Sequence, residues 1–107
     1  MEQRRLGRSG LLVSVVGLGC NNFGGRIDFE ATKKVVHKAL DLGITFFDEA
    51  DTYGDPRGSS EACLGQILGD RRKDIVLATK FWSKSALKAL LSWKFAQSYQ
   101  TPITALR

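Results

Sequence analysis

The chain has 107 residues, enough for one domain, and its hydrophobic and charged fractions of 43% and 25% are typical of a folded globular protein. It contains no run of about 18 apolar residues, so no membrane span is predicted, and its start lacks the apolar core of a secretory signal. We therefore expect a cytoplasmic protein in which Cys20 and Cys63, which form no CxxC pair, are reduced thiols.

The net charge of +5 is concentrated near the carboxyl end. Residues 1–80 hold 12 basic and 11 acidic side chains, whereas residues 81–107 hold four basic side chains and no acidic one. Scattered charges without a recognition motif are typical of a solvated surface, so no nucleic-acid partner is predicted. The charge distribution leaves one alternative function, a small basic binding protein that acts through residues 82–107.

Strand and helix signals alternate along the first 81 residues. Two extended pieces, 4–6 and 11–13, flank a turn bounded by glycines and predict a β-hairpin. The elements expected after it are a strand at 15–19, a helix from Asp28 to Gly43, a strand at 44–47, a helix capped by Ser59 or Ser60 and ended by Gly69, and a strand at 75–79. This βαβαβ order predicts an α/β protein with a parallel sheet.

Two of these predicted strands end in a charged residue. The apolar run at 44–47 stops at Asp48, and the run at 75–79 stops at Lys80. The carboxyl ends of parallel strands meet at one edge, where α/β folds build their sites. Tyr53, five residues past Asp48, follows in the loop above that edge. We therefore expect the three side chains to meet there.

A carboxylate, an ammonium and a phenol at one edge can act as proton-transfer machinery. A free phenol has a pKa of about 10, and a neighbouring ammonium favours its ionised form. Such a tyrosine can donate a proton to a carbonyl oxygen while hydride reaches the carbon. From spacing alone, a plain salt bridge between Asp48 and Lys80, with Tyr53 stacked on the loop, is an equal alternative.

Several segments resemble, in order and spacing, the amino-terminal third of the aldo/keto reductases: VSVVGLGCNNFGG, ALDLGITFFDEADTYG, SSEACLGQIL and RRKDIVLATKF. That family is a (β/α)8 TIM barrel that reduces aldehydes and ketones with NAD(P)H, and its hairpin covers the bottom of the barrel. The resemblance implies that residues 1–81 are a hairpin and three βα units of such a barrel. It also implies that Asp48, Tyr53 and Lys80 are the catalytic aspartate, tyrosine and lysine, although Glu49 stands where the family motif usually has threonine.

The resemblance further implies a cofactor, NADP(H) or NAD(H), whose nicotinamide end contacts Cys20, Asn21, Arg26 and Asp48. From the residues themselves, Cys20 and Asn21 can also belong to an ordinary polar loop.

The remaining motifs argue against other sites. The glycines at 17 and 19 lack the third glycine of a dinucleotide fingerprint, because position 22 is Asn22, so a Rossmann site is not predicted. His37 is the single histidine; it lies on the charged face of its predicted helix and is expected at the surface. One histidine and two distant cysteines predict no metal site.

The resemblance stops near Phe81, and residues 82–107 are predicted to be a helical or irregular tail outside the family pattern, read in another frame or from a rearranged gene. A full barrel needs about 250 residues, and the family's histidine and cofactor-phosphate loops lie on later strands. We therefore expect a truncated oxidoreductase of small carbonyl substrates, with little or no turnover as an isolated chain. The alternative function is a non-catalytic partial barrel that associates with another chain.

Overall fold

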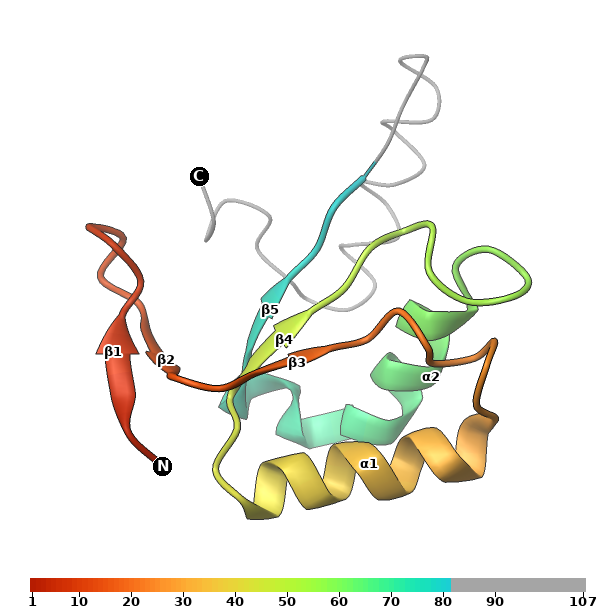
Figure 1. The fold of residues 1–107 in the computed structure, drawn as a ribbon, viewed down its shortest axis with the longest axis horizontal. Helices are drawn as coiled ribbons and strands as arrows, with labels where there is room; N and C mark the ends of the chain where they lie inside the picture. Colours follow the sequence, from red (N-terminus) through yellow and green to blue (C-terminus); the bar gives the residue numbers. More distant parts are fainter. Residues whose placement is uncertain (82–107) are drawn as a thin grey trace.

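The computed structural model describes residues 1–81, which form a hairpin, a three-stranded sheet and two helices (Figure 1). The predicted tail at 82–107 lies outside these residues. The described elements are, in chain order, β1 (Gln3–Arg5), β2 (Leu12–Ser14), β3 (Gly17–Gly19), α1 (Phe29–Asp41), β4 (Phe46–Asp48), α2 (Ser59–Leu68), the 3-10 helix η1 (Gly69–Asp74) and β5 (Val76–Ala78).

The sheet has the strand order β3-β4-β5, and both neighbouring pairs are parallel. The predicted parallel α/β arrangement is therefore confirmed, with β4 in the middle. Register places Asp48, the last residue of β4, beside Gly19 on β3 and Ala78 on β5. The carboxyl ends of all three strands thus lie at one rim.

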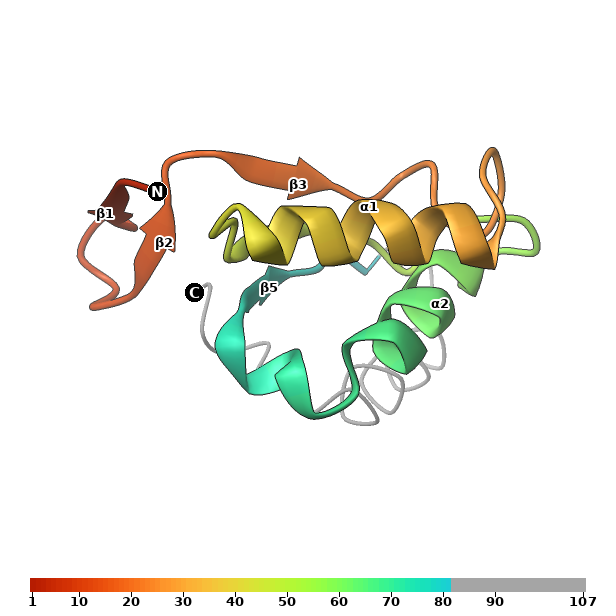
Figure 2. The same cartoon turned by 90° about the horizontal axis from the view of Figure 1, so that it is seen from below.

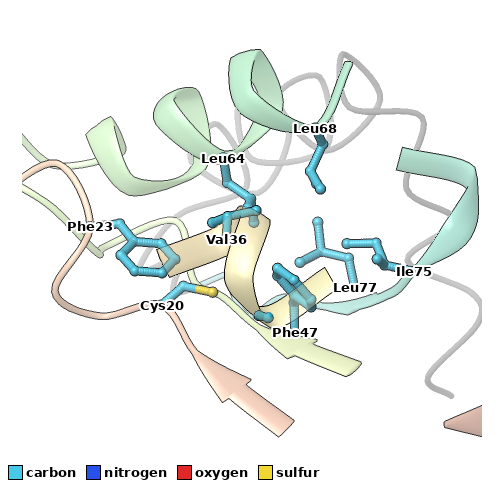
Figure 3. Close-up of a cluster of buried hydrophobic side chains, with 9 residues drawn as sticks. Cys20, Phe23, Val36, Phe47, Leu64, Leu68, Ile75 and Leu77 are labelled. Atoms are coloured by element: carbon cyan, nitrogen blue, oxygen red, sulfur yellow. The ribbon is translucent and has the colours of Figure 1, made fainter. Parts of the chain in front are cut away.

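Both helices pack on the same side of this sheet, as Figures 1 and 2 show. Side chains alternate along a strand, so Phe47 and Leu77 point toward the helices while Asp48 belongs to the opposite face. Phe47 has no exposed surface and lies on the sheet side of the apolar layer between helices and sheet (Figure 3). The buried members of this layer are Cys20, Phe23, Val36, Ala39, Phe47, Leu64, Leu68, Ile75 and Leu77.

Helix α1 begins and ends as the sequence predicts. The Asp28 carboxylate accepts a hydrogen bond from the Ala31 amide at 2.8 Å, which satisfies a donor that the first turn otherwise leaves unpaired. After the helix, Gly43 adopts a positive φ of 83° and donates its amide to the Leu40 carbonyl. Among the helices of residues 1–81, none has both the length and the apolar character needed to cross a bilayer.

The predicted hairpin is confirmed, with β1 and β2 antiparallel. Its attachment to the sheet runs through Ser14 at the end of β2. The Ser14 amide donates to the Thr45 hydroxyl oxygen at 3.1 Å, and the Thr45 amide donates to the Ser14 hydroxyl oxygen at 2.9 Å. Because Thr45 immediately precedes β4, the hairpin is fastened to the amino end of the sheet, away from the rim that carries Asp48 (Figure 1).

The predicted cap of α2 is wrong. Neither Ser59 nor Ser60 caps the helix, because both lie inside its first turn and Gly58 precedes it with a φ of 94° and no side-chain cap. Their hydroxyls are engaged elsewhere: Ser59 donates to the Gly24 carbonyl at 2.8 Å, and Ser60 donates to the Cys20 carbonyl at 2.7 Å. These serines therefore attach α2 to the loop after β3 instead of capping it.

Candidate active site

Asp48 and Lys80 are held at the rim by backbone pairing that continues past the strands. The Glu49 amide donates to the Ala78 carbonyl at 2.7 Å, and the Asp51 amide donates to the Lys80 carbonyl at 2.9 Å. Lys80 lies two residues beyond β5, so these bonds fix its backbone next to the end of β4. The sheet itself therefore sets the spacing between the two charged side chains.

The three residues expected at the rim lie together. The Lys80 ammonium nitrogen is 2.6 Å from a carboxylate oxygen of Asp48 and 5.2 Å from the centre of the Tyr53 ring. The lysine and aspartate side chains are 54% and 52% exposed, so the pair is open to a ligand. An ion pair this exposed contributes only about 0.2–1 kcal/mol to folding, which makes stability a weak reason for this arrangement.

Electrostatics at the rim keep Lys80 charged. Partial burial alone would lower the pKa of its ammonium. The hydrogen bond to Asp48, together with the electrostatic influence of Asp48 and Tyr53, outweighs that effect and raises the pKa of Lys80 above its usual value. Lys80 is thus a permanent positive charge between a carboxylate and a phenol at neutral pH.

Tyr53 is positioned by its backbone. Its amide donates to the Ala50 carbonyl at 3.2 Å, and its carbonyl accepts from the amides of Gly58 at 3.1 Å and Ser60 at 3.2 Å. The next residue, Gly54, has a φ of 96°, and a Cβ built on it would overlap the Ser59 hydroxyl. The loop that carries Tyr53 therefore closes directly onto the first turn of α2.

Replacing Gly54 with alanine is expected to destabilise this loop, because the added methyl group clashes with Ser59 and the backbone needs a left-handed conformation. We expect a loss of about 1–3 kcal/mol in the free energy of unfolding, measured by urea denaturation. Gly10→Ala is the matched control, since Gly10 also has a positive φ of 82° but nothing within 4 Å of an added Cβ. Equal losses in both variants would show that the contact with Ser59 is unimportant.

The residues expected to bind cofactor differ in their exposure to solvent. Asn21 and Arg26 are exposed on the loop that follows β3. The Cys20 side chain is fully buried in the apolar layer, where its thiol contacts the Leu18 carbonyl at 3.5 Å, and its amide donates to the Asp48 carbonyl at 2.9 Å. Burial, with the nearby acidic groups, raises the pKa of this thiol. Cofactor contact at these positions stays a prediction.

Glu49, directly behind the rim, is a feature whose meaning the sequence did not reveal. Its side chain has no exposed surface, and its carboxyl oxygens lie 3.2 Å from the Ala50 amide and 3.0 Å from the Ser60 hydroxyl. Burial raises the pKa of Glu49 to about 8, against the opposing effect of these hydrogen bonds and of Lys80. Strand alternation was the available signal, because a residue after Asp48 must face the helices.

A second buried acid, Glu61, lies on α2 and is 5% exposed. The Thr79 hydroxyl donates to one of its carboxyl oxygens at 2.6 Å, and the other oxygen has no hydrogen-bond partner within residues 1–81. Burial raises the pKa of Glu61, and the neighbouring charge of Asp51 adds to the rise. This contact joins α2 to the residue before Lys80, so it supports the same rim from behind.

His37, which is expected at the surface, lies in the middle of α1 and is partly exposed. Its position on the helix side of the sheet separates it from Asp48.

Comparison with known proteins identifies the class of protein that this fold and rim define. The family model described as "Aldo/keto reductase family" matches residues 15–104, and the chain belongs to that family. The described residues thus form the opening portion of a (β/α)8 barrel, with the first three strands side by side.

Individual relatives agree with this assignment. An uncharacterized oxidoreductase of Bacillus subtilis, YqkF, is 41% identical over 80 residues, which cover 75% of this chain and 25% of that protein. The L-glyceraldehyde 3-phosphate reductase of Escherichia coli is 39% identical over 85 residues, with the same coverage of 75% and 25%. The chain therefore spans about a quarter of the length of these relatives.

A solved structure shows the same fold. The holo form of an aldo-keto reductase from Bacillus halodurans superposes with a TM-score of 0.79 at 33% identity, covering 94% of this chain and 37% of the other.

Proposed function

We propose that this chain carries the proton-donating side and the nicotinamide-facing side of an NAD(P)H-dependent site that reduces small aldehydes or ketones. The observation that supports it most strongly is the contact of Lys80 with Asp48 at 2.6 Å, with the Tyr53 ring 5.2 Å from the same ammonium. A salt bridge needed only for folding would not require a phenol beside it. Membership of the aldo/keto reductase family points to the same chemistry.

Each residue has a separate role in this proposal. Tyr53 gives its hydroxyl proton to the carbonyl oxygen of the substrate, so the alkoxide that would otherwise form is neutralised. Lys80 stabilises the phenolate that remains, because a positive charge favours the ionised partner. Asp48 holds the Lys80 ammonium in place and keeps it charged. Water is the final source of the proton that restores Tyr53, because the rim is exposed.

In this proposal, polar groups near the end of β3 bind the nicotinamide end of the cofactor. Asn21 and Arg26 are exposed on the loop after β3, whose first residue, Cys20, pairs with the Asp48 carbonyl. Amide, guanidinium and carboxylate groups can pair with a carboxamide and a ribose. When bound, NADPH or NADH would supply the hydride. NADP(H) remains our preferred cofactor by resemblance to the family.

The test of this binding uses reduced nicotinamide mononucleotide with the 107-residue chain, followed by NMR. We expect the signals of Asn21 and Asp48 to shift, and we expect AMP at the same concentration to leave them unchanged. Shifts confined to residues on the helix side, or equal shifts with both ligands, would contradict a nicotinamide site at this rim.

The alternative function, association with another chain, draws on a different observation. Within residues 1–81, β3 and β5 are the two edges of the sheet, and both helices lie on one of its faces. Unpaired edges are sites where another strand can add. Light scattering on the purified chain decides this point: association predicts a dimer or larger species, and a stable monomer at high concentration argues against it.

A further inference from the structure

Ser60 connects three parts of the site at one point. Its hydroxyl oxygen lies 2.7 Å from the Cys20 carbonyl oxygen and 3.0 Å from a carboxyl oxygen of Glu49. Its amide donates to the Tyr53 carbonyl. Cys20 in turn donates its amide to the Asp48 carbonyl at 2.9 Å. One buried serine is thus joined, directly or through one residue, to both Asp48 and Tyr53.

Counting protons assigns the charge state of Glu49. A serine hydroxyl has a single proton, and a carbonyl oxygen can only accept. Two oxygens 2.7 Å apart need a proton between them, so the Ser60 proton belongs to the contact with Cys20. A neutral Glu49 can supply a second proton for its own contact with Ser60, so that both contacts are hydrogen-bonded without sharing the serine proton.

We propose that Glu49 is a positioning residue that, as a neutral carboxylic acid, ties the ends of β3 and β4 to the first turn of α2 and so holds Asp48 against Lys80. One Glu49 oxygen accepts from the Ala50 amide, and the other lies 3.0 Å from the Ser60 hydroxyl oxygen, to which the neutral acid of this proposal donates. The neutral state of Glu49 affects the proposed function only because Glu49 helps to hold the rim residues in place. It can be tested by NMR and thermal unfolding, which require no catalytic turnover.

Burial and a neighbouring acid favour the neutral form of Glu49. The charge of Glu61 on α2 adds to the rise in the Glu49 pKa. The thiols of Cys20 and Cys63 also face Glu49, whose charge raises their pKa values. The charge of Lys80 acts on the Glu49 pKa in the opposite direction. Full burial is the larger effect, and it raises the pKa of Glu49 to about 8.

This geometry makes the site dependent on pH in a defined direction. A folded-state pKa above the ordinary value of 4.5 means that the folded chain binds more protons than the unfolded chain between pH 4.5 and about pH 8. The free energy of unfolding therefore falls as pH rises through that window and levels off above it. Glu61 contributes a slope of the same sign, because its pKa is also raised.

The test compares the wild-type chain with Glu49→Gln and Glu49→Ala. A glutamine can donate to Ser60 and accept from the Ala50 amide but cannot ionise. We expect the NMR signal of the Lys80 ammonium in the wild type to show a step near the Glu49 pKa of about 8. In Glu49→Gln this step should vanish, and the Lys80 signal should keep the position that it has in the wild type at low pH. The melting temperature of Glu49→Gln should also fall less steeply with rising pH than that of the wild type.

The remaining variants separate positioning from simple burial. Glu49→Ala should displace the Lys80 signal at every pH, and Glu30→Gln, which removes an exposed acid, should preserve the wild-type step. A step that persists in Glu49→Gln would overturn the proposal. So would a Glu49→Gln chain that is as disturbed as Glu49→Ala at low pH, since Glu49 would then act as a carboxylate. If Glu49→Ala does not fold, the glutamine comparison alone decides.

Discussion

Replacing Tyr53 with phenylalanine is expected to lower carbonyl reduction by about 10²- to 10⁴-fold. The ring, and with it the contact with the Lys80 ammonium, is retained, whereas the hydroxyl proton is lost. At about 1.4 kcal/mol for each factor of ten, the loss corresponds to about 3–5 kcal/mol of transition-state stabilisation. The measurement is the oxidation of NADPH that depends on an added simple aldehyde, followed with the 107-residue chain at high enough concentration for its slow parent rate to be recorded.

Two controls make this result specific to proton donation. The binding of reduced nicotinamide mononucleotide should be nearly unchanged in Tyr53→Phe, because the ring still fills its place. The circular dichroism spectrum should also match that of the parent chain. A variant that retains the parent rate would remove Tyr53 from the chemistry and favour the reading in which Asp48 and Lys80 form a structural ion pair.

Replacing Phe47 with alanine is expected to cost about 3–5 kcal/mol in the free energy of unfolding. Phe47 is fully buried on the central strand, between α1, α2 and the neighbouring strands, so the deleted ring leaves a cavity (Figure 3). Stabilities of natural domains are typically only about 5–15 kcal/mol. The loss is therefore a large part of the total stability. A Phe47→Ala chain that shows no cooperative unfolding transition would also agree with this prediction.

Phe81→Ala is the matched control for this change. Phe81 has the same side chain but is 43% exposed just after Lys80. Its truncation should cost much less, because less apolar surface returns to water. Urea denaturation followed by circular dichroism measures both. A Phe47→Ala chain no less stable than the Phe81→Ala chain would show that the apolar layer does not hold the sheet to the helices.

Much of this fold was predictable because each signal was local. Asp28 and Gly43 mark the ends of α1, and both act at the backbone positions where such residues are favoured. The abrupt charges at Asp48 and Lys80 followed short apolar runs, and parallel pairing alone was enough to bring them to one rim. The three rim residues could therefore be predicted to lie together before any coordinates were known.

The errors came from contacts between segments distant in sequence. Ser59 and Ser60 have the composition of helix caps, but their hydroxyls are engaged by carbonyl groups more than thirty residues earlier, at Gly24 and Cys20. The role of Glu49, which replaces the usual threonine of the family motif, could not be predicted for the same reason. Its partner Ser60 is eleven residues away, in a helix whose packing the sequence does not reveal. Spacing in sequence carries no record of such pairings.

The central claim is that Asp48, Tyr53 and Lys80 form one electrostatic unit at the carboxyl rim of the sheet. The most direct measurement is an NMR titration of the Lys80 ammonium in the parent chain, in Asp48→Asn and in Tyr53→Phe. The claim predicts a raised Lys80 pKa in the parent and a lower one in each variant. Burial lowers the pKa of Lys80, and each variant removes one of the two groups that counteract this effect. A Lys80 pKa that is the same in all three proteins would contradict it.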